Sequence, residues 1–249
     1  MANKQLPSKL GKEPLVDAVF ELRCVSSVSI ADILPGILHS ALGAGLKIER
    51  LPVADLPMAI RQFDPQLLNA PVVRVFWDNY IFLLGDNMVG VACVMPYPGW
   101  KSFRNIILKV VDIINQTGIV TQVARYSMKY VDILETSHVP VSELINMKLV
   151  VGDIALKDQN FQLNMQIKSD PFIQALQVGS PAQSQSFDGK IRKGTLVSID
   201  TLSSGELPDL KVLAEELPSR LDALHDENKK MFFACLTSAA INYLEPSFD

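Results

Sequence analysis

Cysteine and histidine are scarce in this chain of 249 residues, with three of each. The cysteines are far apart and form no Cys-x-x-Cys pair, which excludes a disulfide scaffold and is typical of a reducing compartment. The histidines are equally scattered, and none has a second metal-ligating residue at a useful helical spacing. We therefore expect a cytoplasmic protein with no metal and no cofactor. The residues concerned are Cys24, Cys93, Cys235, His39, His138 and His225.

The chain also lacks a long apolar run and an excess of positive charge. Its longest apolar segment, residues 88–95, is far shorter than the roughly 20 residues of a membrane-spanning helix. The beginning of the chain has no apolar segment of the signal-peptide kind. The 23 basic and 27 acidic residues give a formal net charge of −4, so no overall positive field attracts nucleic acid or anionic lipid. We expect no contact with membranes.

Common catalytic and phosphate-binding motifs are missing as well. The sequence contains no G-x-x-x-x-G-K-[ST], no G-x-S-x-G and no H-E-x-x-H. Gly43-Ala44-Gly45 has the first spacing of a dinucleotide loop, but it lacks the third glycine and ends a predicted helix, where glycine is a common cap. A catalytic set that converges only in the fold stays open. The sequence identifies no catalytic residue and favours a protein that is not an enzyme.

The pattern of apolar residues predicts an α+β fold. Hydrophobic residues make up 48% and charged residues 20%, as in ordinary globular domains. The predicted element order is β-α-β-β-β-α-β followed by β-β-β-β-α. Because the strands come in hairpin-linked runs, this order favours two mainly antiparallel sheets covered by helices, with a long C-terminal helix. We divide the chain into halves at 1–137 and 138–249, and leave open whether they share one core.

The individual elements follow from periodicity. Alternation predicts strands at 15–25, 58–63, 72–77, 80–94, 121–134, 148–154, 161–168, 172–178 and 195–202. Helical spacing predicts helices at 30–41, 100–116 and 141–145, and a C-terminal helical region after Pro208 with a restart at Pro218. Gly85-Asp86-Asn87 breaks the strand at 80–94 into a hairpin. The polar, glycine-rich stretch 179–194 is predicted to be a long loop or a projecting hairpin tip.

Basic residues give two candidate binding surfaces. Arg74, Arg125 and Lys129 share one face of the predicted first sheet, opposite the face of Tyr126, Met128 and Tyr130. If the protein is an enzyme or a nucleotide-binding regulator, we expect these three cations to converge in a concave pocket that holds an anion. The second surface is the cluster of Lys190, Arg192 and Lys193. This cluster is the basis for a nucleic-acid partner, which is the least favoured alternative because no RNA- or DNA-binding motif accompanies it.

The corner at residues 95–100 is the most informative local feature. Met95-Pro96-Tyr97-Pro98-Gly99-Trp100 joins a strand to a helix, and its prolines and glycine enforce a tight turn. The simpler interpretation is a corner that clamps the helix onto the sheet. The alternative is that Tyr97 and Trp100 form a rigid aromatic platform for a peptide or a ligand.

A set of short motifs resembles a sporadically distributed bacterial family over nearly the whole chain. The motifs are the strand at 14–23, Tyr97-Pro98-Gly99-Trp100 with Phe103, Arg125-Tyr126, and a late His225 with Phe232. The resemblance implies carriage on mobile or defence-related loci, and it supplies no activity, cofactor or catalytic residue to transfer. Lys129-Tyr130 departs from the more arginine-rich strand expected there. The architecture of the second half also resembles SecB-type export chaperones, which is an analogy of fold alone.

These observations favour a non-enzymatic protein-binding component, of the antitoxin, immunity or chaperone-like kind, in a bacterial defence or toxin–antitoxin locus. We expect its partner to be a protein encoded nearby or a second copy of the chain. Sheet edges available for strand addition and the long C-terminal helix are the surfaces that would bind it. The alternatives are an enzyme or small-ligand regulator that uses the Arg74, Arg125 and Lys129 face, and a nucleic-acid-binding regulator.

Overall fold

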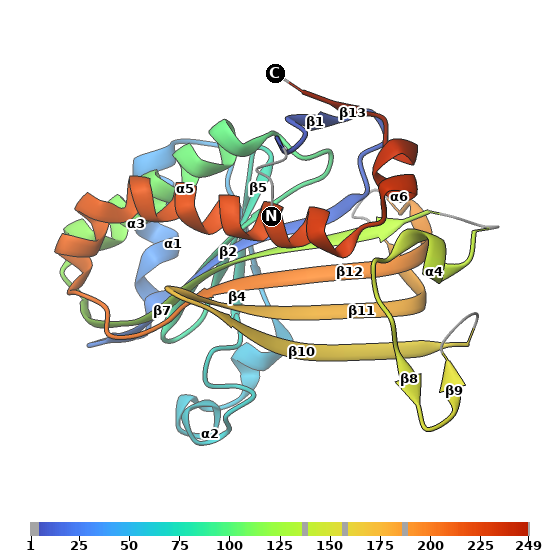
Figure 1. The fold of residues 1–249 in the computed structure, drawn as a ribbon. Helices are drawn as coiled ribbons and strands as arrows, with labels where there is room; N and C mark the ends of the chain where they lie inside the picture. Colours follow the sequence, from blue (N-terminus) through green and yellow to red (C-terminus); the bar gives the residue numbers. More distant parts are fainter. Residues whose placement is uncertain (1–4, 136–138, 156–158, 186–188, 249) are drawn as a thin grey trace.

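The computed structural model describes residues 5–135, 139–155, 159–185 and 189–248, and its main element is a nine-stranded antiparallel sheet (Figure 1). The strands of this sheet are β2 (Leu15–Ser26), β3 (Lys47–Arg50), β4 (Val73–Trp77), β5 (Tyr80–Leu84), β6 (Met88–Cys93), β7 (Val120–Leu134), β10 (Phe161–Ser169), β11 (Phe172–Gln185) and β12 (Ile191–Ser203). Their order across the sheet is β10-β11-β12-β7-β2-β6-β5-β4-β3.

Two small sheets and six α-helices complete the fold. The small sheets pair β1 (Lys9–Leu10) with β13 (Pro246–Ser247), and β8 (Val150–Val151) with β9 (Ile154–Ala155). The helices are α1 (Ile30–Leu42), α2 (Met58–Phe63), α3 (Trp100–Thr117), α4 (Val141–Leu144), α5 (Leu210–Cys235) and α6 (Ser238–Tyr243), with a short 3₁₀ helix at Pro52–Asp55. The predicted α+β class, the antiparallel pairing and the long C-terminal helix are confirmed.

A single sheet replaces the two predicted sheets, because β7 pairs with a strand of each half. On one side β7 pairs with β2, with Phe20 opposite Met128. On the other side it pairs with β12, with Tyr130 opposite Ile199. The sheet therefore runs through both halves, and the larger apolar core draws residues from both, from Phe20 and Phe103 to Phe172 and Leu213. The boundary at 137–138 lies outside the described residues.

The helices α1, α3 and α5 cover one face of the large sheet. The predicted stripe of α3 is buried, from Phe103 through Ile107 to Ile114. Helix α5 contacts α3, β7 and β12, and its leucines at 213, 217, 221 and 224 are buried. In Figure 1, α3 and α5 lie above the sheet, while α2 and the β8–β9 hairpin project below it. No helix within the described ranges combines the length and the apolar character that crossing a membrane requires.

Three predicted elements differ from the structure. Residues 58–63 form helix α2 and not a strand, because Pro57 begins a helical turn in which its carbonyl accepts from the Ile60 and Arg61 amides. Pro218 lies inside α5, since the helix already begins at Leu210 behind the capping side chain of Asp209. The single strand predicted at 148–154 is instead a small hairpin, in which β8 pairs with β9.

The stretch 179–194 is largely a projecting hairpin. Strand β11 extends to Gln185 and β12 begins at Ile191, and the two remain paired beyond the irregularity between Gly179 and Ala182. Residues 186–188 of the predicted tip lie outside the described residues. The sequence also missed β3, a four-residue edge strand with four exposed side chains. Its alternation is too short to distinguish it from a loop.

Candidate functional site

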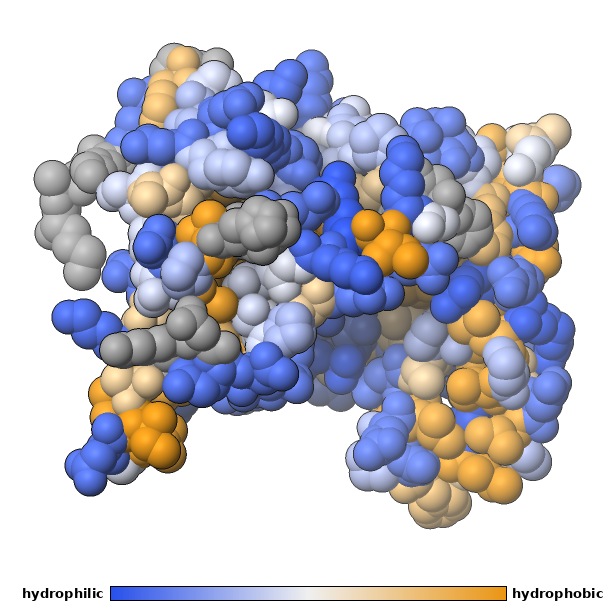
Figure 2. All heavy atoms as spheres, turned by 90° about the vertical axis from the view of Figure 1, so that its right-hand side faces the viewer, coloured by the Kyte–Doolittle hydropathy of each residue, from blue (hydrophilic) through white to orange (hydrophobic). Residues whose placement is uncertain are grey.

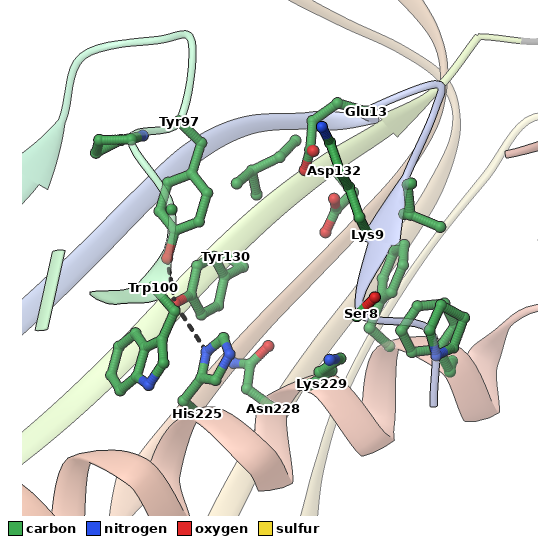
Figure 3. Close-up of a pocket in the computed structure, with 17 residues that line it drawn as sticks. Ser8, Lys9, Glu13, Tyr97, Trp100, Tyr130, Asp132, His225, Asn228 and Lys229 are labelled. Carbon is green, nitrogen blue, oxygen red and sulfur yellow. Dashed lines mark hydrogen bonds between the residues drawn. The ribbon is translucent and has the colours of Figure 1, made fainter. Parts of the chain in front are cut away.

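A cavity of about 430 Å³ lies between the sheet, the corner before α3 and one side of α5 (Figure 3). Its deep wall consists of Tyr130 and Asp132 from β7, together with Asn228 from α5. Residues 97–100 form a second wall, and residues 7–10 of the N-terminal segment lie across the mouth. The volume is in the range of small-ligand sites, which occur where several elements meet.

The predicted aromatic corner forms one wall of this cavity. Gly99 has a φ of +88°, a conformation that L side chains rarely adopt, and this lets the chain turn directly into α3. Trp100 then stands at the first position of the helix and stacks on His225 of α5, with ring centres 4.2 Å apart. Tyr97 packs edge-to-face against both Phe103 and Tyr130. The corner therefore clamps α3 and α5 together and lines the cavity at the same time.

Three polar side chains form a chain of hydrogen bonds in the deep wall. The hydroxyl oxygens of Tyr97 and Tyr130 are 3.2 Å apart, and the Tyr130 hydroxyl lies 3.1 Å from His225 Nδ1. Burial, with a smaller contribution from Lys229, lowers the pKa of His225 to about 4, so the ring is neutral at pH 7. Burial also raises the pKa of both tyrosines above their ordinary range. The chain is thus a neutral hydrogen-bonding surface.

Asp132 is the deepest charged group of the cavity. It lies on the buried face of β7 with 6% of its surface exposed. Burial raises the pKa of its carboxyl well above the ordinary value, and the nearby carboxylate of Glu13 raises it further. Figure 3 shows the two carboxyl groups close to one another, with the Lys9 ammonium beside the Glu13 carboxyl. A carboxyl held in this way stabilises a ligand that brings hydrogen-bond donors or positive charge.

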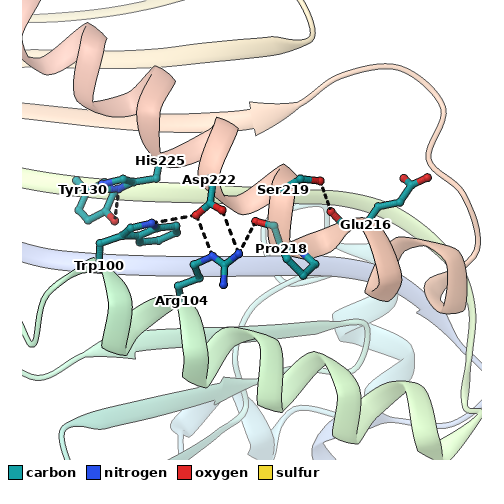
Figure 4. Close-up of polar contacts among 8 residues, drawn as sticks. All are labelled: Trp100, Arg104, Tyr130, Glu216, Pro218, Ser219, Asp222 and His225. Carbon is teal, nitrogen blue, oxygen red and sulfur yellow. Dashed lines mark hydrogen bonds and ion pairs between the residues drawn. The ribbon is translucent and has the colours of Figure 1, made fainter. Parts of the chain in front are cut away.

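Helix α5 is fixed over the cavity by two polar anchors. Asn228 is buried, and its amide donates to the carbonyls of Met128 and Ile199, at 3.1 and 3.0 Å. One turn and a half earlier, Asp222 accepts two hydrogen bonds from Arg104 of α3 and one from the Trp100 indole (Figure 4). The indole ring is therefore held from its edge by Asp222 and on its face by His225. This wall is rigid before any ligand arrives.

The mouth of the cavity has positive charge. Lys9 of β1 and Lys229 of α5 line it, and Lys9 is exposed. Strand β1 is held there by its pairing with β13, in which Lys9 lies opposite Ser247. The two chain ends are thus joined beside the cavity, although they are far apart in sequence. The cavity has an acidic interior and a rim with two lysines.

The first basic surface predicted from the sequence does not form a single pocket. Arg125 and Lys129 lie on the face of β7 that points away from the helices, where Arg125 is near Glu21, with 3.6 Å between the charged atoms. Arg74 lies on β4, four strands from β7, or about 19 Å at the usual strand spacing. It is therefore too far away to share an anion with the other two. Within the described residues, Arg125 Nε and Asp200 Oδ1 are buried on this face without a hydrogen-bond partner.

The second basic surface is also divided. Arg192 donates to the Glu13 carbonyl at 2.8 Å and forms an ion pair with Glu135 at 3.3 Å, so its charge is used within the protein. Lys193 lines a separate shallow hollow beside Pro181 and Thr195. Lys190 directly precedes β12 at the tip end of the β11–β12 hairpin and has an interaction of its own. The structure gives no support for a continuous basic patch here.

The sequence identified Tyr97 and Trp100 but missed Asp132 and Asn228. A signal for Asp132 was present, since it continues the alternation of Tyr126, Met128 and Tyr130 and so places a carboxyl on the buried face of a strand. Asn228 occupies a position on α5 one turn after Leu224, within the buried stripe. A polar residue within an apolar pattern is the feature that both share.

The described residues contain no cluster of three or more histidine, cysteine or acidic side chains that could hold a metal ion; His138 lies outside them. No family model matches the chain, and the search of curated proteins finds no match. The resemblance to the sporadically distributed bacterial family stays a prediction. Four of the residues on which it rests, Tyr97, Trp100, His225 and Phe232, line the same cavity.

Proposed function

We propose that the protein binds a small organic ligand in the cavity between α5 and the corner before α3. One observation carries this proposal: an aromatic wall, a neutral Tyr97–Tyr130–His225 chain and the buried carboxyl of Asp132 surround one open space. Polar groups placed in a largely apolar pocket are how small-ligand sites fix orientation. The pKa values favour binding over acid–base catalysis, since His225 has lost its titrating proton well below pH 7 and the two tyrosines keep theirs, so none of the three changes its protonation state in the neutral range.

A pair of tyrosine variants tests this proposal. Tyr130→Phe removes the hydroxyl that joins Tyr97 and His225, without creating a large void. We expect this variant to bind the ligand of the wild type about tenfold more weakly, because one or two hydrogen bonds are lost. Tyr126→Phe is the matched control. Tyr126 lies on the same face of β7 but outside the cavity, and its hydroxyl accepts a hydrogen bond from Arg220 at 3.4 Å.

The measurement is a thermal-shift screen of nucleotides, amino acids, polyamines and sugars at millimolar concentration. A ligand raises the melting temperature according to its affinity, so a compound that binds the cavity should shift the wild type and Tyr126→Phe equally. Its shift for Tyr130→Phe should be smaller. The proposal is wrong if no compound shifts the wild type, or if the shifts of all three proteins are the same.

Binding of a protein partner is the second candidate function, and it is supported by two exposed apolar tips. Helix α2 presents Met58, Ile60 and Phe63, of which Phe63 is 90% exposed, and the β8–β9 hairpin presents Val150, Val151 and Ile154. Figure 2 shows apolar side chains at the ends of two lobes, with a hydrophilic hollow between them. We keep the proposal of an antitoxin, immunity or chaperone-like component on this ground, because exposed apolar patches often mark interaction sites.

Phe63→Asp tests the partner-binding candidate without disturbing the core. We expect a tagged wild-type chain, expressed from its own locus, to retain a stoichiometric protein partner or a second copy of itself. The variant should lose that partner, because a charge cannot be buried in an apolar contact without cost. Ile191→Asp, at an exposed site on β12, is the control and should retain it. Mass spectrometry identifies any co-purified partner, and light scattering gives the mass of the complex. A monomeric wild type without a partner contradicts this candidate.

A further inference from the structure

The cavity proposed above as a ligand site has an unequal distribution of charge along its depth, and this restricts what it can hold. Asp132 lies at its inner end, on the buried face of β7. Lys229 of α5 lines another part of the cavity, while the Lys9 ammonium lies beside the Glu13 carboxyl. Figure 3 shows these groups around the same space. A ligand that contacts both Asp132 and Lys229 must differ at its two ends.

The inner end is suited to hydrogen-bond donors. Around Asp132 lie the neutral Tyr97–Tyr130–His225 chain and the carboxyl of Glu13, and the Lys9 ammonium lies beside Glu13 (Figure 3). No hydrogen bond within the described residues is assigned to the Asp132 side chain, so a ligand can supply its donors. Burial disfavours the ionised form of Asp132 in the empty cavity, and a ligand that brings N–H donors or positive charge offsets that cost. The ionised carboxylate has two oxygens in one plane and accepts best from two parallel N–H groups. The stacked Trp100 and His225 rings form a rigid wall beside it, which is suited to a planar group.

The outer end is suited to an anion. Lys229 is half-buried beside Phe232 and Phe233, so its ammonium group can contact a ligand in the cavity, whereas the charge of Lys9 is balanced by Glu13. Glu13 lies on the same rim and disfavours an anion placed close to it. The favoured position for the anion is therefore on the Lys229 side of the mouth.

The geometry points to a ligand that presents a planar pair of parallel N–H donors to Asp132 and carries an anionic group that contacts Lys229. This inference rests on the proposed ligand-binding function. Two common sources share this chemistry. A guanine nucleotide has the N1–H and N2–H pair and a phosphate, and arginine has a guanidinium and a carboxylate. A volume of about 430 Å³ can accommodate either of them.

The experiment is calorimetric titration of the full chain with matched probes. Guanosine 5′-monophosphate is compared with adenosine 5′-monophosphate, and arginine with lysine, since the second member of each pair lacks the parallel donors. Guanosine and agmatine lack the anion. We expect one donor-bearing anion to bind at least about tenfold more tightly than its partner without the donor pair, and about tenfold more tightly than its counterpart without the anion.

Two variants link the preference to the named residues. Asp132→Asn replaces one acceptor oxygen by a donor and should abolish the preference for guanine over adenine, or for arginine over lysine. Lys229→Met should abolish the preference for the anion and keep that for the donors. Lys211→Met is the control, because Lys211 is exposed at the far end of the same helix.

The outcomes separate the two proposals. If either the guanine nucleotide or arginine binds tightly, that compound identifies the class of ligand. Equal binding of the members of each pair, or a preference that survives in Asp132→Asn, overturns this inference. If none of the probes binds while another compound of the thermal-shift screen binds in a Tyr130-dependent manner, the inference is wrong and the ligand-binding function stands. If no compound binds at all, both are wrong.

Discussion

The Asp132→Asn variant is expected to be more stable than the wild type at neutral pH. The wild-type carboxyl is buried, and its pKa is raised well above the ordinary value, first by burial and then by Glu13. A group that disfavours its charged form in the folded state destabilises the fold wherever it is charged in the unfolded state. An uncharged amide of the same shape removes that cost. Stabilisation by loss of a functional group is typical of binding sites and commonly amounts to about 0.5–2 kcal/mol or more.

The stability of the wild type should change with pH in a direction that the raised pKa of Asp132 determines. Between the unfolded and the folded pKa of Asp132, the folded state holds a proton that the unfolded state has released. The stability of the wild type therefore decreases as the pH rises through this interval, by at most about 1.4 kcal/mol per unit. The stability difference between Asp132→Asn and the wild type should grow over the same interval and become constant above the folded pKa. Urea denaturation at pH 5, 6.5 and 8 measures it.

His225 acts in the opposite direction and does not obscure this test. Its pKa is lowered to about 4, mainly by burial, so it destabilises the fold as the pH decreases below about 6.5, where the unfolded imidazole takes up a proton. This contribution is common to both proteins and is removed by taking the difference. Asp112→Asn, at an exposed site on α3, is the control for the substitution itself and should change the stability by less than about 0.5 kcal/mol. An Asp132→Asn protein that is less stable at pH 8 than at pH 5, relative to the wild type, contradicts the burial argument.

The α+β class and most elements follow from the sequence because their patterns are local. The stripe of α3 and the hairpin around Gly85-Asp86-Asn87 are determined by residues close together in the chain, and both are confirmed. The prediction of a strand at 58–63 was wrong because it also relied on a local pattern alone. Met58 and Ile60 alternate with smaller or polar neighbours as in a strand, but their side chains face solvent, so alternation did not report burial. The Arg61 contact with Asp86, 25 residues away, fixes this segment as a helix.

The candidate site depended on contacts that no local pattern contains. Trp100 and His225 stack across 125 positions of sequence, and the pairing of β7 with β12 that positions Asp132 depends on the whole sheet. The sequence singled out Tyr97 and Trp100, because a rigid aromatic corner is visible locally, and both residues line the cavity. It grouped Arg74 with Arg125 because both were assigned to one face of the predicted first sheet, but three strands lie between them in the structure. Strand order is the information that was missing.

Asp86→Ala is expected to cause the largest loss of stability of the changes considered, about 3–5 kcal/mol. Asp86 is 3% exposed, and its carboxylate accepts from Arg61 Nε and Nη2, both at 2.9 Å, and from Ser29 Oγ at 2.8 Å. Burial alone would raise the pKa of Asp86, but the hydrogen bonds from Arg61 and Ser29 outweigh it and lower the pKa. Removing the carboxylate leaves the Arg61 guanidinium buried without its counter-charge. Urea denaturation near pH 7 measures the loss.

Two further variants separate the ion pair from simple loss of volume. In Arg61→Met with Asp86→Ala the uncompensated charge is gone, so we expect most of the lost stability to return, as for other buried pairs replaced by apolar groups. Glu227→Ala breaks the surface pair with Lys230, at 2.7 Å, and should cost less than about 1 kcal/mol. Equal losses for the single and the double variant would mean that the cost lies in packing. The Arg61–Asp86 pair connects α2 to the β5–β6 turn. Asp86→Ala should therefore also weaken the binding of any partner that contacts Phe63, even at temperatures where the rest of the fold is intact.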